Sequence, residues 1–168
     1  LVTLAAMITN SLLSVYTQRE LRMPVMRRGG FLVCVGLAVA ASQAGLKAAA
    51  RVIGSAARTQ ARLFVAGAVA LFAVVPALPD AAPFWVAACG ASALLWLVNP
   101  VLLSVISRHA GSERVQGSLM GLNESIANVG AVLGPLFNYS TLAVAGALPF
   151  WLLNVALAVA FVLLHTST

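Results

Sequence analysis

One carboxylate, Glu124, stands within a long apolar stretch and is the side chain of clearest chemical interest. Counted from Val115, nine helical residues place it about 14 Å along a helix, near the middle of a bilayer if that helix spans one. A carboxylate at that depth is costly, so by default it faces a cavity or a partner and can carry a proton. Two interpretations stay open. Glu124 exchanges a proton during function, or it has a structural role, paired with a basic residue of another bundle or lying in a wetted vestibule.

Small and polar residues accompany Glu124 at helical spacing: Gly117, Gly121, Ser125 and Asn128. Residues at this spacing share one helix face. Further along, Gly130 and Gly134 form a G-x-x-x-G motif that Pro135 follows directly. In membranes, such small residues let a second helix backbone approach closely, and proline can kink the helix. We therefore predict that the four glycines and the proline serve helix packing.

Amide side chains in the apolar stretches are candidates for lining a substrate cavity: Asn10, Gln43, Asn99 and Asn128. An amide both donates and accepts hydrogen bonds, so it can hold a polar ligand. It can equally bond across helices, where each bond contributes about 0.6 kcal/mol on average. Both roles stay open for each amide.

The elements that position these residues are predicted to be membrane-spanning helices. Hydrophobic residues make up 61% of the 168 residues and charged residues 8%, against about 25% charged in soluble domains. Ten basic and four acidic side chains cannot cover a soluble domain of this size. Runs of Ala, Leu and Val without strict alternation favour helices over a β-barrel. We predict an all-α, polytopic integral membrane protein with six transmembrane helices at about 1–18, 29–50, 62–79, 83–107, 115–137 and 149–165.

The last two predicted spans lie in one uncharged run, 125–164. We expect the chain to break between them because turn-forming and polar residues cluster there: Gly134, Pro135, Asn138, Tyr139, Ser140, Gly146 and Pro149.

Basic residues predict the orientation in the membrane. Six lie in the connections after the second and fourth spans: Lys47, Arg51, Arg58, Arg62, Arg108 and Arg114. Four lie in the connection after the first span: Arg19, Arg22, Arg27 and Arg28. Positive charge concentrates on the cytoplasmic side, so the connections with six should be cytoplasmic, and Arg51, Arg58, Arg62 and Arg108 should set topology there. The net charge of +6 then indicates contact with anionic lipid and not with nucleic acid.

A short repeat suggests that the six spans form two groups of three. Leu12–Val15 and Leu102–Val105 both read LLSV, and each is preceded by an asparagine and followed by an arginine. These segments lie in the first and fourth spans, which should run in opposite directions. Inverted three-helix repeats are typical of transporters, whose substrate sites lie at the repeat interface.

The segment 107–137 resembles part of a known transporter family. The pattern Q-G-x-L-x-G-x3-S-x2-N-x5-G-P runs from Gln116 to Pro135. It resembles the eleventh helix of the major facilitator superfamily, nearest the tetracycline-exporter-like drug/proton antiporters. Pro100 and Ser107-Arg108 resemble the end of the tenth helix. Weaker matches to the loop between the eighth and ninth helices are Gln43, Gly45, Arg51 and Gly54, without the acidic residue of the family signature.

The resemblance implies twelve helices in two six-helix bundles, with alternating access driven by the proton gradient. This chain would be the C-terminal bundle, and its partner the missing N-terminal bundle or, if the chain is complete, a second copy. We expect a fragment, because the chain opens at Leu1. The expected function is secondary active transport, proton-coupled efflux of a small organic molecule or drug. The proton would be the coupling ion, with no bound cofactor. The expected location is a plasma or bacterial inner membrane, with an organelle membrane as the alternative.

Two other functions compete with transport. Gly90-Ala91-Ser92-Ala93 and His165 resemble the serine and histidine of rhomboid-type intramembrane proteases. The two side chains are expected about 10 Å apart in depth, outside hydrogen-bond reach, so we expect no enzyme. A membrane scaffold that only binds partners is the other alternative. The sequence carries no phosphate loop, metal-ligand spacing or dinucleotide fingerprint.

Overall fold

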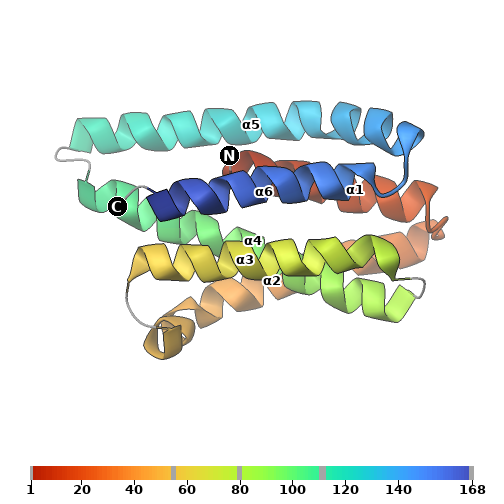
Figure 1. Cartoon of the computed structure of the whole chain (residues 1–168), viewed down its shortest axis with the longest axis horizontal. Coiled ribbons are helices and arrows are strands. Elements are labelled where there is room, and N and C mark those ends of the chain that lie inside the picture. Colours follow the sequence, from red (N-terminus) through yellow and green to blue (C-terminus); the bar gives the residue numbers. More distant parts are fainter. Residues whose placement is uncertain (1, 54–55, 79–80, 110–112, 167–168) are drawn as a thin grey trace.

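The computed structural model describes residues 2–53, 56–78, 81–109 and 113–166, and all regular structure in these ranges is helical. The α-helices are α1 (Val2–Arg19), α2 (Val25–Ile53), α3 (Ala57–Val74), α4 (Ala81–His109), α5 (Glu113–Val144) and α6 (Leu148–Thr166), and the 3₁₀ turn η1 (Val75–Ala77) follows α3. Successive helices run in opposite directions along the long axis of the bundle (Figure 1). The predicted all-α class is confirmed.

Two ends of the bundle can be named from the connections. α1, α3 and α5 end, and α2, α4 and α6 begin, at one end of the bundle, here called the α1–α2 end (Figure 1). α2 and α4 end, and α3 and α5 begin, at the other end, here called the α2–α3 end. The helix ends next to the two connections predicted to be cytoplasmic therefore share one end.

Four helices of the described chain are long and apolar enough to cross a membrane: they contain Val25–Leu46, Ala57–Ala77, Ala82–Val105 and Leu148–Thr166. Of the six predicted spans, these four have the required length and composition. α1 and α5 fall outside this group, because threonine, serine and asparagine side chains interrupt their apolar sequence.

α5 is longer than the sequence predicted. The expected break between the last two spans occurs at 145–147, around Gly146, and the helix continues past the expected end at 137, through Pro135 to Val144. A proline removes one backbone hydrogen bond, whereas ending the helix in apolar surroundings would leave several groups unpaired. The hydroxyls of Ser140 and Thr141 also donate to backbone carbonyls one turn earlier. These polar residues therefore remain compatible with the helix.

An aromatic cluster joins four helices near the α1–α2 end. Tyr16 of α1 stacks on Phe84 of α4, with 5.7 Å between ring centroids, and meets Phe150 of α6 edge-on at 4.9 Å. Phe31 of α2 lies 5.5 Å from Phe84. All four rings are buried, and such offset and edge-on pairs add to the stability from burial. We call these four residues the aromatic core.

Side-chain hydrogen bonds join α6 to α3 at two positions along the helices. Asn154 is buried, and with its amide oriented to pair both atoms it donates to Val69 O (3.2 Å) and accepts from Ala73 N (3.1 Å). Nearer the α2–α3 end, Arg62 donates to Leu164 O through Nε (3.1 Å) and Nη2 (2.7 Å). A basic side chain on the last carbonyls of a helix satisfies acceptors that the helix cannot pair itself.

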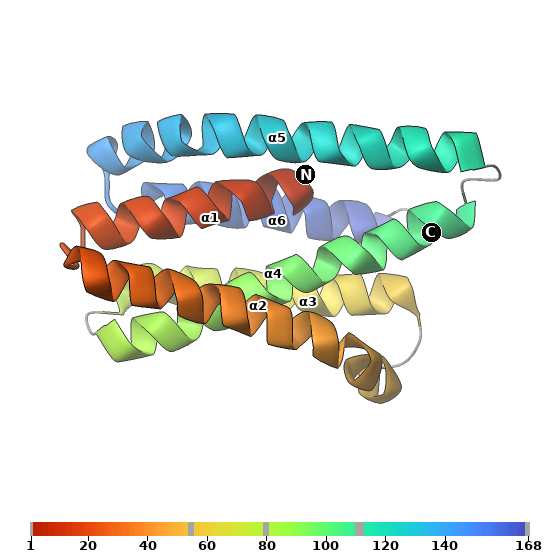
Figure 2. The same cartoon turned by 180° about the vertical axis from the view of Figure 1, so that it is seen from behind.

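One broad face of the bundle is formed by α5, α1, α4 and α2, with α3 and α6 behind it (Figure 2). α2 is the least covered of the apolar helices. In its most apolar stretch 11% of the residues are buried, against 39% in the corresponding stretches of α3 and α4. We call this side the open face.

Candidate functional site

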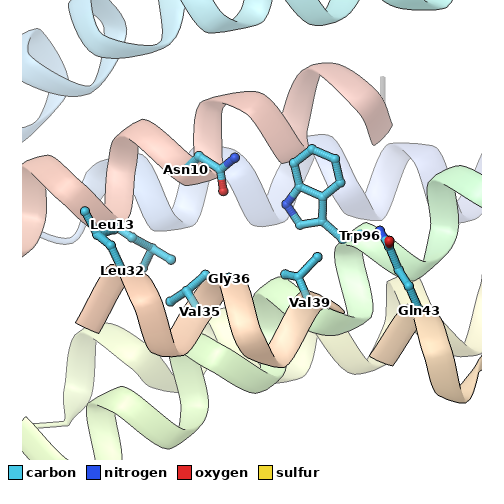
Figure 3. Close-up of a pocket in the computed structure, with 8 residues that line it drawn as sticks. All are labelled: Asn10, Leu13, Leu32, Val35, Gly36, Val39, Gln43 and Trp96. Atoms are coloured by element: carbon cyan, nitrogen blue, oxygen red, sulfur yellow. The ribbon is translucent and has the colours of Figure 1, made fainter. Parts of the chain in front are cut away.

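A groove lies on the open face between α1, α2 and α4 (Figure 3). Its first part is a hollow of about 370 Å³ lined by Asn10, Leu13, Leu32, Val35, Gly36, Val39, Gln43 and Trp96. The second part, about 250 Å³, is lined by Gln43, Leu46, Trp96, Asn99, Pro100 and Leu103. Because the two parts share Gln43 and Trp96, we describe them together as the amide groove.

Three of the four amides singled out in the sequence meet in this groove. Asn10 comes from α1, Gln43 from α2 and Asn99 from α4. Within the described residues, none of the three makes a side-chain hydrogen bond, and Asn10 and Gln43 are exposed. Asn10 and Trp96 project into the space between α1 and α2 (Figure 3). Unpaired amides beside an indole ring can hold a polar ligand and cover its apolar surface at the same time.

Glu124 and Asn128 lie on α5 and are not part of the groove lining. Asn123 hydrogen-bonds to α1 and so marks the side of α5 that faces α1. Each residue of an α-helix is rotated by about 100° from the residue before it. Around the axis of α5, Glu124 therefore lies about 100° and Asn128 about 140° from Asn123. Phe137, about 40° round in the other direction, lines a hollow with residues of α6. Both polar residues therefore face away from α6, on the side of the open face, and both are exposed.

The second glycine pair of α5 lies directly against α1. A Cβ on Gly130 would lie 2.9 Å from Met7 Cβ, and one on Gly134 would lie 2.7 Å from Ser11 Oγ and 3.4 Å from Ile8 Cα. Such distances leave no room for a larger residue unless the helices separate. Gly130 and Gly134 thus occupy the kind of position that a close-packing motif requires.

The first glycine pair behaves differently. A Cβ on Gly117 or Gly121 would meet nothing within 4 Å, and both residues are exposed. Their predicted packing role is therefore not found within this chain. The two pairs have the same spacing, but the first turns of α5 extend beyond α1, as Figure 2 shows.

Hydrogen bonds reinforce the contact between α1 and α5. Thr3 Oγ1 donates to Asn123 Oδ1 (2.7 Å). Asn138 Nδ2 donates to Ile8 O (2.9 Å) and Ser11 Oγ (2.7 Å). Together with the contacts of Gly130 and Gly134, these residues define what we call the α1–α5 seam.

Sequence reasoning did not single out Asn138 as a contact residue or Trp96 at all. Asn138 continues the spacing of Gly130 and Gly134 by four residues, and Trp96 precedes Asn99 by three. Helical spacing was therefore the available signal for both.

The four arginines expected in the cytoplasmic connections differ in their contacts. Arg51 and Arg58 are exposed, and Arg62 bonds to the end of α6. The side chain of Arg108 lies outside the described residues.

Ser92 and His165 do not form a catalytic pair. Ser92 is fully buried on α4, and its Oγ has no hydrogen-bond partner within the described chain. His165 is exposed in the last turn of α6. α4 and α6 both start at the α1–α2 end. Ser92 comes 11 residues after Ala81, the start of α4, and His165 comes 17 residues after Leu148, the start of α6. At about 1.5 Å per residue, the two side chains differ by about 9 Å in depth. This separation is incompatible with a serine–histidine hydrogen bond.

The open face therefore combines an uncharged groove of amides and an indole with a carboxylate on a neighbouring helix. Such a surface can bind a small molecule that has both polar and apolar parts, and the carboxylate can exchange a proton. Comparison of the chain with protein-family models, with curated proteins and with solved structures found no match.

Proposed function

We propose that the chain is an integral membrane protein that forms one six-helix bundle of a secondary active transporter. Large apolar side chains support the membrane environment: Val25, Met26, Val86 and Val144 are each at least 75% exposed. A soluble protein rarely presents so much apolar surface, whereas lipid chains would cover it. α1 and α5, the more polar helices, pair with each other, which keeps several of their polar groups bonded inside the bundle.

The contacts between helices support two inverted repeats. Exchanging α1 with α4, α2 with α5 and α3 with α6 reverses the direction of every helix (Figure 1). The same exchange maps the α1–α5 contact onto the α4–α2 contact, and maps the α3–α6 contact onto itself. These three contacts are extensive, whereas the α3–α4 contact, the most extensive in the bundle, maps onto the much smaller α1–α6 contact. The first three contacts are those that support a three-plus-three inverted repeat.

The amide groove is the observation that carries the proposal. Its three unpaired amides come from three helices and surround one tryptophan, so a ligand there would touch α1, α2 and α4 together. A site shared by several helices can couple ligand binding to their relative movement. Because the groove is open on one side, a second bundle would be needed to enclose it. That partner is the N-terminal bundle of a longer chain or a second copy.

Glu124 is the proposed proton carrier. It lies on the open face, where a second bundle would exclude bulk water, and it is one of the four acidic residues in the chain. A carboxylate in such a site can bind a proton on one side of the membrane and release it on the other. The expected activity is proton-coupled movement of a small organic molecule.

The test is transport by the native polypeptide in proteoliposomes with an imposed pH gradient. Tetracycline and uncharged aromatic drugs serve as probes, and internal pH is recorded with a trapped dye. We expect drug movement with opposite proton movement, abolished by Glu124→Gln and unaffected by Ser125→Ala, a neighbouring exposed substitution. Unchanged pH-driven transport by Glu124→Gln would remove this residue from the mechanism.

A second set of variants tests the groove. Gln43→Leu and Trp96→Ala should weaken drug binding, measured by equilibrium titration, while Cys34→Ser on an exposed part of α2 should not. A folded protein with neither drug binding nor pH-driven flux would favour the scaffold interpretation. Covalent labelling of Ser92 by a fluorophosphonate would revive the protease interpretation.

A further inference from the structure

Three arginine side chains at the α1–α2 end have no hydrogen-bond or ion-pair partner among the described residues: Arg22, Arg27 and Arg28. Only the backbone N–H of Arg28 is paired, with Pro24 O (3.0 Å). The neighbouring Arg19 is engaged, since it donates to Tyr139 O (3.2 Å) and its guanidinium lies 5.6 Å from the Tyr139 ring centroid. Arg22 and Arg27 are exposed, and Arg28 is half-buried. We call these three residues the arginine triad.

Glu20, the carboxylate nearest to the triad in the sequence, lies against the turn between α5 and α6. Glu20 Oε2 lies 3.0 Å from the position that a Cβ on Gly146 would occupy, so its side chain lies against the α5–α6 turn. Among the described residues, the triad is therefore a concentration of positive charge without a compensating carboxylate.

Local stability does not account for the triad. Arg27 and Arg28 lie in the first turn of α2, which has no acidic residue, and cations there oppose the helix dipole. Arg22 has a φ of 47°, a backbone conformation that few residues other than glycine adopt. Positive charge on this side is also contrary to the predicted orientation. An external anion would offset the positive charge and its unfavourable interaction with the dipole of α2.

The triad lies at the level expected for lipid phosphates. The apolar segment of α2 begins at Val25, and Phe31, one turn beyond Arg27, lies 5.4 Å from the ring of Trp85. Tryptophan is enriched at the headgroup level of membranes. Val25 and Met26, within the triad, are 75% and 89% exposed. Their exposure favours a ligand that has acyl chains beside its phosphate.

We propose that the arginine triad binds the headgroup phosphate of an anionic phospholipid, with Val25 and Met26 against its chains. Guanidinium groups suit this role because they bind phosphate oxygens through two parallel hydrogen bonds. The inference uses only the membrane placement in the proposed function and does not require transport.

The test compares lipids bound to the native polypeptide, measured by native mass spectrometry with defined lipid additions. The probes are phosphatidylglycerol and phosphatidylcholine with identical chains. Because each arginine near an anionic surface contributes about fivefold in affinity, the Arg22→Gln/Arg27→Gln/Arg28→Gln variant should lose preference for phosphatidylglycerol by on the order of a hundredfold. Phosphatidylcholine binding should not change.

Matched variants separate a specific site from general charge. Arg51→Gln/Arg58→Gln, two exposed residues at the α2–α3 end, should leave the tightest phosphatidylglycerol site intact. Substituting the triad with lysine keeps the charge but loses the paired hydrogen bonds, so it should retain only part of the preference. Full preference in the triple glutamine variant, or an equal loss in the control variant, would overturn the proposal.

Two further arms identify the source of the phosphate. Val25→Ser/Met26→Ser should weaken phosphatidylglycerol binding, and millimolar glycerol phosphate or inorganic phosphate should not displace the lipid. Displacement by either soluble ion would make free phosphate the ligand and contradict the proposal. Circular dichroism and vesicle flotation of each variant report folding and bilayer insertion separately. A variant that inserts and loses the lipid supports the site even where drug transport is absent.

Discussion

The α1–α5 seam and the aromatic core hold parts of the same bundle together by different means. In the seam, two glycines bring the backbones close, and Thr3, Asn123 and Asn138 add hydrogen bonds. In the aromatic core, four large rings from four helices fill the space. The seam therefore depends on glycines that let two helices approach closely, and the core depends on large rings that fill the space between helices.

The difference matters in the membrane placement proposed above, because lipid chains are as apolar as the protein interior. Burial in a bilayer contributes less than it does in water, so close packing and hydrogen bonds between helices carry more of the stability. Truncation should damage the core most, and enlargement should damage the seam most. Four comparisons test this contrast. Each variant is measured as the free energy of unfolding in mixed micelles that are titrated with dodecyl sulfate and followed by circular dichroism.

The largest effect is expected for Phe84→Ala in the core. Phe84 is fully buried and contacts both Tyr16 and Phe31, so its removal leaves a cavity. We expect a loss of about 3 kcal/mol, the lower end of such substitutions, because lipid reduces the transfer contribution. Trp151→Ala, at a 54% exposed aromatic residue, should cost far less. Equal losses would show that the core is not specially packed.

Gly134→Val should be a damaging small-to-large change in the seam. Its new side chain would overlap Ser11 Oγ and crowd the backbone at Ile8, so α1 and α5 must separate. Overpacking of this kind costs about 2 kcal/mol. Gly121→Val is the matched control on the exposed part of α5 and should be close to neutral. A neutral Gly134→Val would contradict the close approach of the two helices.

Asn138→Ala removes the two hydrogen bonds from α5 to Ile8 and Ser11. At about 0.6 kcal/mol per bond, the loss should be about 1 kcal/mol. It is limited because Asn138 Oδ1 is buried without a partner among the described residues, and substitution removes that unfavourable group as well. Asn128→Ala on the exposed side of α5 should leave stability unchanged. Equal effects at the two asparagines would weaken the distinction between seam and open face.

The smallest effect is expected at the end of the seam. Thr3→Val and Asn123→Ala each remove one hydrogen bond of 2.7 Å. A double-mutant cycle should give a coupling energy of about 0.6 kcal/mol. Additive losses in the double variant would mean that the bond contributes nothing to stability.

The sequence by itself determined the helical class, the positions of the apolar segments and the candidates for chemistry. These follow from composition and spacing, because a backbone in apolar surroundings must pair its own polar groups and a helix does so locally. The same reasoning placed the end of the fifth helix at 137, whereas α5 continues through Pro135 to Val144. One missing hydrogen bond costs less than ending a helix where no water can replace the others.

Tertiary structure alone decided which of these residues act together. Gly117 and Gly121 have the same spacing as Gly130 and Gly134, yet only the second pair meets α1. Likewise, Asn10, Gln43 and Asn99 share one groove, while Asn128 lies apart on α5. The spacing of residues identifies one face of one helix. The helix that covers this face is set by packing among segments distant in the sequence, and periodicity carries no information about that packing.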